Sequence, residues 1–368
     1  MQQASTSGGG FGAVRYTQAQ LDQFLSAHER FQRREPRGRR AVMRFLSARG
    51  MDFSRRLLTE ADFTGADLRE ARLVLANFEC ATLYCADLRQ VDARGANLNR
   101  ADLRGCSLRD ANLSAARLDQ ADMREAILAR GDVEKGLQLG GWSAPGRAKK
   151  SRYEPCAVDF TNCSMKGAKL GKAKLKGANF TGALLTGADL SGAALENATF
   201  DGAVLVDVDM SGATIDPAAL AKCVKPPSED AHLRAGELKA RLAAANRWLV
   251  TDGAEGRPAV LDREDLRTLG AAFEHARLTA LSAKEACAIG VSFKGAQLQA
   301  ANFEKADLRD ADFTDADLRG ACLRGANLSH ARFEGADLRP LRLASGDRPV
   351  DLDEATYQEG AFAASLRE

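Results

Sequence analysis

A repeat of five residues runs through most of this 368-residue chain. A large apolar residue recurs at every fifth position, beginning with Phe53, Leu58 and Phe63, and a small residue, most often alanine, stands two positions before it. A helix would spread such residues around its axis, and a strand would send every second one to the solvent face. The chain is therefore expected to turn once per pentad and to direct two side chains of each pentad into a shared interior.

Phenylalanine carries a second period of 20 residues. The two sets with this spacing are Phe160, Phe180 and Phe200, and Phe273, Phe293, Phe313 and Phe333. The spacing predicts coils of four pentads, in which rings of successive coils stack at the β spacing of about 4.8 Å. Eight of the nine prolines lie outside the repeats, Pro340 being the exception. Stacked coils need backbone N–H groups for bonds to their neighbours, and proline has none.

The pentads resemble those of the pentapeptide-repeat family, whose pattern is A(D/N)LXX. Examples are Ala66-Asp67-Leu68, Ala101-Asp102-Leu103, Ala188-Asp189-Leu190 and Ala316-Asp317-Leu318. The resemblance implies an all-β solenoid of the right-handed quadrilateral β-helix type, here with short α-helical caps and inserts. It also implies that the chain acts by binding other molecules, although a fold by itself does not specify a function.

Breaks in the repeat divide the chain into segments. The expected segments are a disordered N-terminus (1–14), a capping helix with a lead-in segment (15–50), a first pentapeptide array (51–133), a projecting basic and aromatic loop (134–155), a second array (156–215), a linker with a second helix (216–270), a third array (271–343) and a C-terminal partial coil (344–368). The sequence leaves open whether the arrays form one continuous solenoid or two.

The first helix is expected to close the open end of a solenoid, whose apolar interior would otherwise meet water. Thr17 and Gln20 have the spacing of a capping box. The residues expected on the apolar face that follows are Leu21, Phe24, Leu25, His28 and Phe31. His28 on that face is interpreted as a core or cap residue.

A second helix repeats this pattern before the third array. Leu242 and Trp248 have the spacing of Leu25 and Phe31, and a Gly-Arg pair follows each helix. The pattern indicates a tandem duplication of helix, turn and array.

Nothing in the sequence predicts catalysis, so the chain is not expected to be an enzyme, and no cofactor or metal is assigned. The eight cysteines include no C-x-x-C, and the four histidines have no cysteine or histidine at ligand spacing. The sequence has no P-loop, dinucleotide-binding fingerprint or nucleophile elbow. Cys106 and Cys163 occupy the inward small-residue position, so packing explains them.

Charge is nearly balanced, with 52 basic and 50 acidic side chains. This balance excludes a globally basic DNA-coating protein and a globally acidic mimic of DNA. Residues 147–176 are an exception, because nine basic side chains there face only Glu154 and Asp159. The candidate partner-binding residues are Trp142, Arg147, Lys149, Lys150, Arg152, Tyr153, Lys166, Lys169, Lys172, Lys174 and Lys176. A solvated charged face is the alternative interpretation of this region.

These features predict a non-catalytic protein-binding scaffold that presents rigid β-helix faces and a basic, aromatic loop to a macromolecular partner. An acidic protein surface is the first choice of partner, nucleic acid the second and membrane lipid the third, and a homodimer is left open. The alternative, implied by the resemblance, is a protein that binds DNA gyrase or topoisomerase, as quinolone-resistance pentapeptide proteins do. The sequence has no apolar run of about 18 residues and no signal-peptide pattern, so we expect no transmembrane segment and a bacterial cytoplasmic location.

Overall fold

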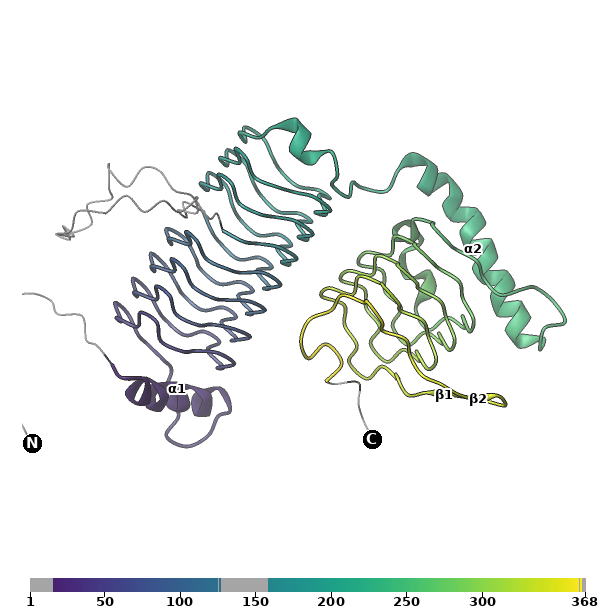
Figure 1. Ribbon diagram of the computed structural model, residues 1–368, viewed down its shortest axis with the longest axis horizontal. Coiled ribbons are helices and arrows are strands. Elements are labelled where there is room, and N and C mark those ends of the chain that lie inside the picture. The colour runs from purple at the N-terminus through teal and green to yellow at the C-terminus, as the bar shows by residue number, and fades with distance from the viewer. Residues whose placement is uncertain (1–15, 125, 127–157, 364, 366–368) are drawn as a thin grey trace, which may run out of the picture. The chain divides into compact units, whose positions relative to one another are not determined.

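The computed structural model describes residues 16–124, 126, 158–363 and 365. The chain divides into two compact units, unit 1 (Met1–Lys225) and unit 2 (Pro226–Glu368), and each has a helix beside stacked coils (Figure 1). The named elements are α1 (Gln18–Gln32), the 3-10 helix η1 (Pro217–Leu220), α2 (Glu229–Val250), the 3-10 helix η2 (Leu266–Phe273), β1 (Leu341–Leu343) and β2 (Gly346–Arg348).

Each regular coil contains four pentads, as the 20-residue period predicts. Parallel bridges join Val42 to Asp62 and Asp62 to Thr82, and this spacing continues along the stack. The backbone N–H of each pentad centre donates to the next coil, as Leu68 N does to Asp87 O at 2.9 Å. Between bridges the chain turns, and the second residue of most turns has a positive φ. The coils therefore form a four-sided parallel β-solenoid held together by backbone hydrogen bonds between successive coils.

The first and second arrays form one solenoid in unit 1. Asn112 bridges Asp159, and Asp122 bridges Lys169. Both pairs are 47 residues apart where the regular spacing is 20, so the stack accommodates 27 extra residues without losing its register. Buried side chains of both arrays belong to one core. The loop expected at 134–155 lies outside the described residues.

Phenylalanine rings stack through the interior at the predicted period. In unit 1, Phe180 stacks on Phe160 with centroids 5.1 Å apart and on Phe200 at 4.8 Å. In unit 2, Phe313 stacks on Phe293 at 5.0 Å, and the next ring of the series follows at 5.2 Å. The stacked rings are fully or almost fully buried, which confirms that pentad centres point inward.

Helix α1 covers the first coil of unit 1 and begins at the predicted capping box. The Thr17 hydroxyl accepts a hydrogen bond from Gln20 N–H, and the Gln20 side chain accepts one from Thr17 N–H. Leu21, Leu25 and His28 are buried. These three residues form a narrow stripe along the helix, four and then three residues apart, and this stripe closes the end of the solenoid.

The predicted apolar face of α1 is wrong at its edges. Phe24 and Phe31 are 49% and 40% exposed, because they flank the buried stripe and the coil beneath is too narrow to cover them. His28 is structural, as expected. Its Nδ1 accepts a hydrogen bond from Ala41 N–H at 3.0 Å, and its Nε2 lies 3.1 Å from Thr59 O.

Unit 2 repeats this arrangement with α2 against its own first coil. Leu238, Leu242 and Ala245 of α2 share a core with Ala259 and Leu261. The first bridge of unit 2 begins at residue 260 and the first bridge of unit 1 at residue 42. In unit 1 the solenoid therefore starts within the predicted capping helix and lead-in segment (15–50). In unit 2 it starts within the predicted linker and second helix (216–270).

The end of the third array differs from the prediction at Leu343. This expected pentad centre lies in β1, which pairs antiparallel with β2, and its side chain is 47% exposed. Pro340 precedes β1, and a proline cannot donate a backbone N–H to a neighbouring coil. The coil resumes after the hairpin, since Cys322 bridges Asp351. Asp351 directly precedes Leu352, and the five-residue period predicted a partial coil in this segment.

Candidate binding surfaces

Aspartate and arginine two residues apart form pairs on the outer sides of the coils. The residue between them is the buried pentad centre, so both polar side chains project from the same side. Asp87 Oδ1 accepts from Arg89 Nε at 2.7 Å. Asp67 and Arg69 make the same contact at 2.7 Å, and these hydrogen bonds hold the pKa of the Asp67 carboxyl below its usual value. The pairs cancel charge within each pentad.

The five lysines predicted as partner-binding residues lie on one coil of unit 1. We call this set the lysine band: Lys166, Lys169, Lys172, Lys174 and Lys176. Lys166 is half-buried, and the other four are exposed. The band follows three consecutive pentads, so it extends around adjoining sides of a single coil.

The lysine band interrupts the pairing of aspartate with arginine. In the preceding coil, on the side that carries Lys169, Asp122 Oδ1 accepts from Arg124 Nε at 2.9 Å. Lys169 bridges Asp122, so Lys169 and the buried Gly171 take the places of this pair one coil later. The band members that form no ion pair with any described residue are Lys169, Lys172 and Lys176. These three lysines are therefore cationic side chains without an ion pair among the described residues, and Lys169 lies between Asp122 and Asp189 of the neighbouring coils.

The lysine band also adjoins the position at which the extra residues interrupt the stack. Lys174 N–H donates to Ala126 O at 3.4 Å, and Ala126 is the last described residue before 127–157. Six of the predicted site residues lie in that range, outside the described residues. They are Trp142, Arg147, Lys149, Lys150, Arg152 and Tyr153. The structure thus brings the five lysines together, and the contribution of the other six residues stays a prediction.

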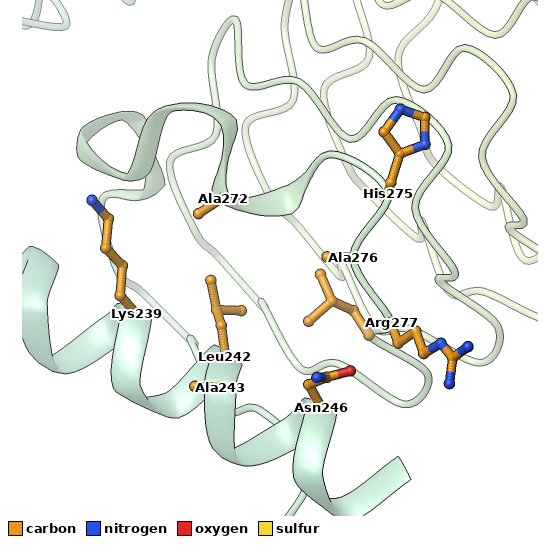
Figure 2. Close-up of a pocket in the computed structure, with 9 residues that line it drawn as sticks. Lys239, Leu242, Ala243, Asn246, Ala272, His275, Ala276 and Arg277 are labelled. Atoms are coloured by element: carbon orange, nitrogen blue, oxygen red, sulfur yellow. The ribbon is translucent and has the colours of Figure 1, made fainter. Parts of the chain in front are cut away.

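Unit 2 has a groove between α2 and its first coil (Figure 2). The groove has a volume of about 440 Å³. Leu242 and Ala243 of α2 face Ala276 across it, and Lys239 and Arg277 stand near its two ends (Figure 2). The lining is mostly aliphatic with a cationic rim, and it contains no pair of groups arranged for acid–base or nucleophilic chemistry.

Two buried cysteines are packing residues, as their inward positions predict. The Cys106 thiol donates to Leu83 O at 2.8 Å and the Cys163 thiol to Leu113 O at 2.7 Å. Burial raises the pKa of both thiols, and a protonated thiol is a poor nucleophile and metal ligand.

The part of the chain that the structure describes has neither a candidate metal site nor a candidate membrane span. There, no group of three or more histidine, cysteine, aspartate or glutamate side chains is placed to bind a metal ion. Neither α1 nor α2, the two α-helices described, has the length and apolar character needed to cross a membrane.

A second basic surface, which the sequence analysis did not predict, lies at the end of α1 and outside the pentad arrays. Residues 30–40 contain six arginines and one glutamate. All six arginines are exposed and form no ion pair with any described residue. Arg40 Nε donates to Glu60 O, and the side chains of the other five form no hydrogen bond with a described residue either. We call these five the cap-turn arginines: Arg30, Arg33, Arg34, Arg37 and Arg39. The run ERFQRREPRGRR is the signal that would have identified this surface from the sequence.

Comparison with known proteins agrees with the repeat. The family described as Pentapeptide repeats matches the chain in eight copies, over residues 57–92, 94–130, 157–182, 178–216, 292–329 and 301–339. No curated protein matches the chain. The matched residues lie in the pentad arrays of both units.

Several solved structures are similar to parts of this chain. Full-length QnrB1, a plasmid-mediated fluoroquinolone resistance protein, is 18% identical over 49% of this chain and 93% of its own, with a TM-score of 0.29. A pentapeptide repeat protein from the thylakoid lumen of Arabidopsis thaliana is 21% identical over 45% and 77%, with a TM-score of 0.23. HetL of the cyanobacterium Nostoc, involved in regulating heterocyst differentiation, is 22% identical over 86% and 89%, with a TM-score of 0.16.

These low identities and TM-scores carry no argument about a partner. The argument for the family comes instead from the matched repeats, together with the coils of four pentads and the buried pentad centres. The chain belongs to the pentapeptide-repeat family.

Proposed function

We propose that this chain is a non-catalytic protein-binding scaffold, built on a right-handed quadrilateral β-helix, and that the lysine band is its partner site. The observation that carries the proposal is the loss of the Asp–Arg pair where Lys169 and Gly171 follow Asp122 and Arg124. On this side the two preceding coils carry such a pair, Asp102 with Arg104 and Asp122 with Arg124, and in the following coil Asp189 accepts from Ser191 N–H instead. The lysine band is the place where the repeat keeps its shape and changes its charge.

A rigid support makes such a band suited to an acidic partner. Backbone hydrogen bonds to both neighbouring coils hold this coil, for example Lys169 N–H to Ala121 O at 2.9 Å in the preceding coil and Leu170 N–H to Asp189 O at 2.7 Å in the following coil. Like charges fixed close together repel one another, and an acidic protein surface would relieve that repulsion. Trp142 and Tyr153 are proposed as aromatic anchors beside the band, since large aromatic residues often dominate the energy of protein interfaces.

The alternative function is binding to DNA gyrase or topoisomerase. The family resemblance supports it, but a DNA-like surface needs uncompensated acidic charge. Asp67 and Asp87, on one side of unit 1, are each bonded to an arginine of their own pentad. An acidic protein partner at the lysine band therefore accounts better for the charges on the described surface.

Affinity capture with the full chain as bait tests the proposal. The test variant reverses Lys169, Lys172 and Lys174 to Glu, and a second variant replaces Trp142 and Tyr153 with Ala. We expect a protein with an acidic surface that the wild-type chain retains at low salt and releases at high salt, and that the reversal variant does not retain. Recovery of gyrase or topoisomerase would support the alternative.

A matched control reverses three lysines of unit 2, Lys284, Lys294 and Lys305, and so makes the same change in net charge. We expect this control to retain the partner. The proposal is wrong if the control and the lysine-band variant lose it equally, or if the lysine-band variant retains every protein that the wild-type chain captures.

A further inference from the structure

We propose that the cap-turn arginines and Phe31 form a binding site for single-stranded nucleic acid. This surface is separate from the lysine band. It lies at the α1 end of unit 1, where Val42 forms the first bridge of the stack. Five successive bridges lead from Val42 to Lys169 along one side of the stack. At the β spacing, this places Lys169 roughly 24 Å from Val42.

The backbone gathers the five arginines into one closed turn. Glu35 N–H donates to Arg30 O at 2.9 Å, and Arg39 N–H donates to Ala27 O at 2.9 Å. The turn folds back on α1 so closely that a Cβ on Gly38 would lie 2.4 Å from Phe31 N. The cap-turn arginines therefore surround the end of the helix on a fixed backbone, next to a phenyl ring that is 40% exposed.

The fold does not require these arginines. A cation in the last turn of a helix is favoured by the helix dipole, and Arg30 is sufficient for that. The duplicated cap of unit 2 shows what the fold needs. Residues 247–257 carry two arginines, one aspartate and one glutamate, with no net charge, whereas residues 30–40 carry a net charge of +5. The excess positive charge is an additional property of the first cap.

The chemistry of the cap turn favours nucleic acid over an acidic protein. All basic side chains in residues 30–40 are arginine, whose planar guanidinium binds phosphate through two parallel hydrogen bonds. The centre of a protein interface is normally depleted of charge and built from several apolar side chains. Residues 30–40 have the opposite composition, since they contain six arginines and one large apolar side chain, Phe31. An exposed ring among phosphate-binding groups can stack on an unpaired base, which requires a single strand.

Fluorescence anisotropy with a labelled 20-nucleotide oligo(dT) and the full chain tests this site. Five phosphate contacts predict a slope of log K against log salt of about −3.5, so affinity should fall roughly a hundredfold between 50 and 200 mM salt. Replacing Arg33, Arg34 and Arg37 with Ala should make the slope shallower by about 2. Phe31→Ala should weaken binding about tenfold with an unchanged slope, because stacking carries no charge.

Matched controls separate this site from general electrostatic attraction. Reversing Lys169, Lys172 and Lys174 to Glu in the lysine band should leave oligo(dT) affinity within about twofold at 150 mM salt, because the Debye length of about 8 Å is far shorter than the separation of the two surfaces. Oligo(U) and a 20-base-pair duplex show which nucleic acid is preferred, and both single strands should bind more tightly than the duplex. If the triple alanine variant has a lower melting temperature, the single variants Arg33→Ala and Arg37→Ala should each reduce the slope by about 0.7.

Several outcomes would overturn the proposal. One is a wild-type chain that does not bind oligo(dT) at 50 mM salt. Another is unchanged affinity in the triple alanine variant or in Phe31→Ala. A third is displacement of oligo(dT) by polyglutamate at equal charge concentration, which would indicate an acidic protein surface as the ligand.

Discussion

The two caps of this protein use the same local construction but carry different surfaces. Leu25 in α1 and Leu242 in α2 are both buried against the first coil of their unit. In each unit a glycine then packs against the helix. A Cβ on Gly38 would lie 2.4 Å from Phe31 N, and one on Gly256 would lie 3.0 Å from Trp248 N. The shared positions are those that close the solenoid.

Positions outside this shared set have diverged. The turn after α1 carries the cap-turn arginines, whereas the turn after α2 has no net charge. His28 of α1 is replaced at the corresponding position by Ala245, and both are buried. The comparison indicates that closing the end of a solenoid constrains only a few contacts. Net charge and titratable side chains can therefore differ between the two caps.

The largest expected effect comes from removing a stacked ring in either unit. Phe180→Ala in unit 1 and Phe313→Ala in unit 2 should each lower the free energy of unfolding by about 3–5 kcal/mol, because a cavity remains between two neighbouring rings. Each change should lower the melting temperature of its own unit only, as measured by hydrogen exchange of amides in both units during heating. Equal destabilisation of both units by one substitution would show that they unfold together.

A smaller effect is expected from two Asp–Arg pairs, one in each unit, that differ in burial. The side chain of Arg309 in unit 2 is 3% exposed, and that of Arg89 in unit 1 is 34% exposed. Arg309→Ala should reduce the free energy of unfolding by about 2–3 kcal/mol, because Asp307 loses its charged hydrogen-bond partner. Arg89→Ala should change it by less than about 1 kcal/mol. Equilibrium denaturation measures both, and equal values would mean that burial does not determine the strength of these pairs.

The pH dependence of stability should also differ between the caps. Desolvation on burial lowers the pKa of His28 below the ordinary value for histidine, about 6.5, and its Nδ1 must be unprotonated to accept from Ala41 N–H. At pH values above the ordinary pKa of histidine, the neutral imidazole therefore stabilises unit 1. This stabilisation is lost as the pH falls through the lowered pKa of His28. Unit 1 should lose stability relative to unit 2 as pH is lowered from 7 to below about 6.5.

The substitution His28→Ala provides the control for this prediction. It should remove the pH-dependent difference between the units and reduce stability by about 1–3 kcal/mol at pH 7, because Ala41 N–H loses its acceptor. Thermal melts of the wild-type chain and the variant over this range, followed unit by unit, measure the effect. A wild-type unit 1 that is equally stable at both ends of the range would contradict the assignment of a neutral His28.

The smallest effects on stability are expected at the two basic surfaces. Reversing Lys172 of the lysine band or Arg33 of the cap turn to Glu should change the free energy of unfolding by less than about 0.5 kcal/mol, because both side chains are exposed and make no described ion pair. Circular dichroism melts measure this directly. A decrease of more than about 1 kcal/mol in the free energy of unfolding would mean that the side chain stabilises the fold.

Local features of the repeat could be predicted from the sequence because they depend on short-range geometry. The inward direction of Phe180 and Phe313, the capping box at Thr17 and the packing role of Cys106 each follow from a fixed position within a pentad or a helical turn. The predicted lysine band is brought together for the same reason, since its members lie in three consecutive pentads. Its partner and the role of Trp142 and Tyr153 stay predictions.

By itself, the sequence determined the five-residue turn, the 20-residue coil and the two helical caps, because each arises from contacts within a few tens of residues. Only the tertiary structure decided that Asn112 pairs with Asp159 across 27 extra residues, and that Phe31 remains exposed beside the cap-turn arginines. Register between coils is set by hydrogen bonds between distant segments, and exposure is set by how much of a helix the coil beneath it can cover. Neither quantity is encoded in a local pattern. The run ERFQRREPRGRR marks the charge of the cap turn in the sequence, whereas its place beside an exposed ring at the end of the solenoid depends on the fold.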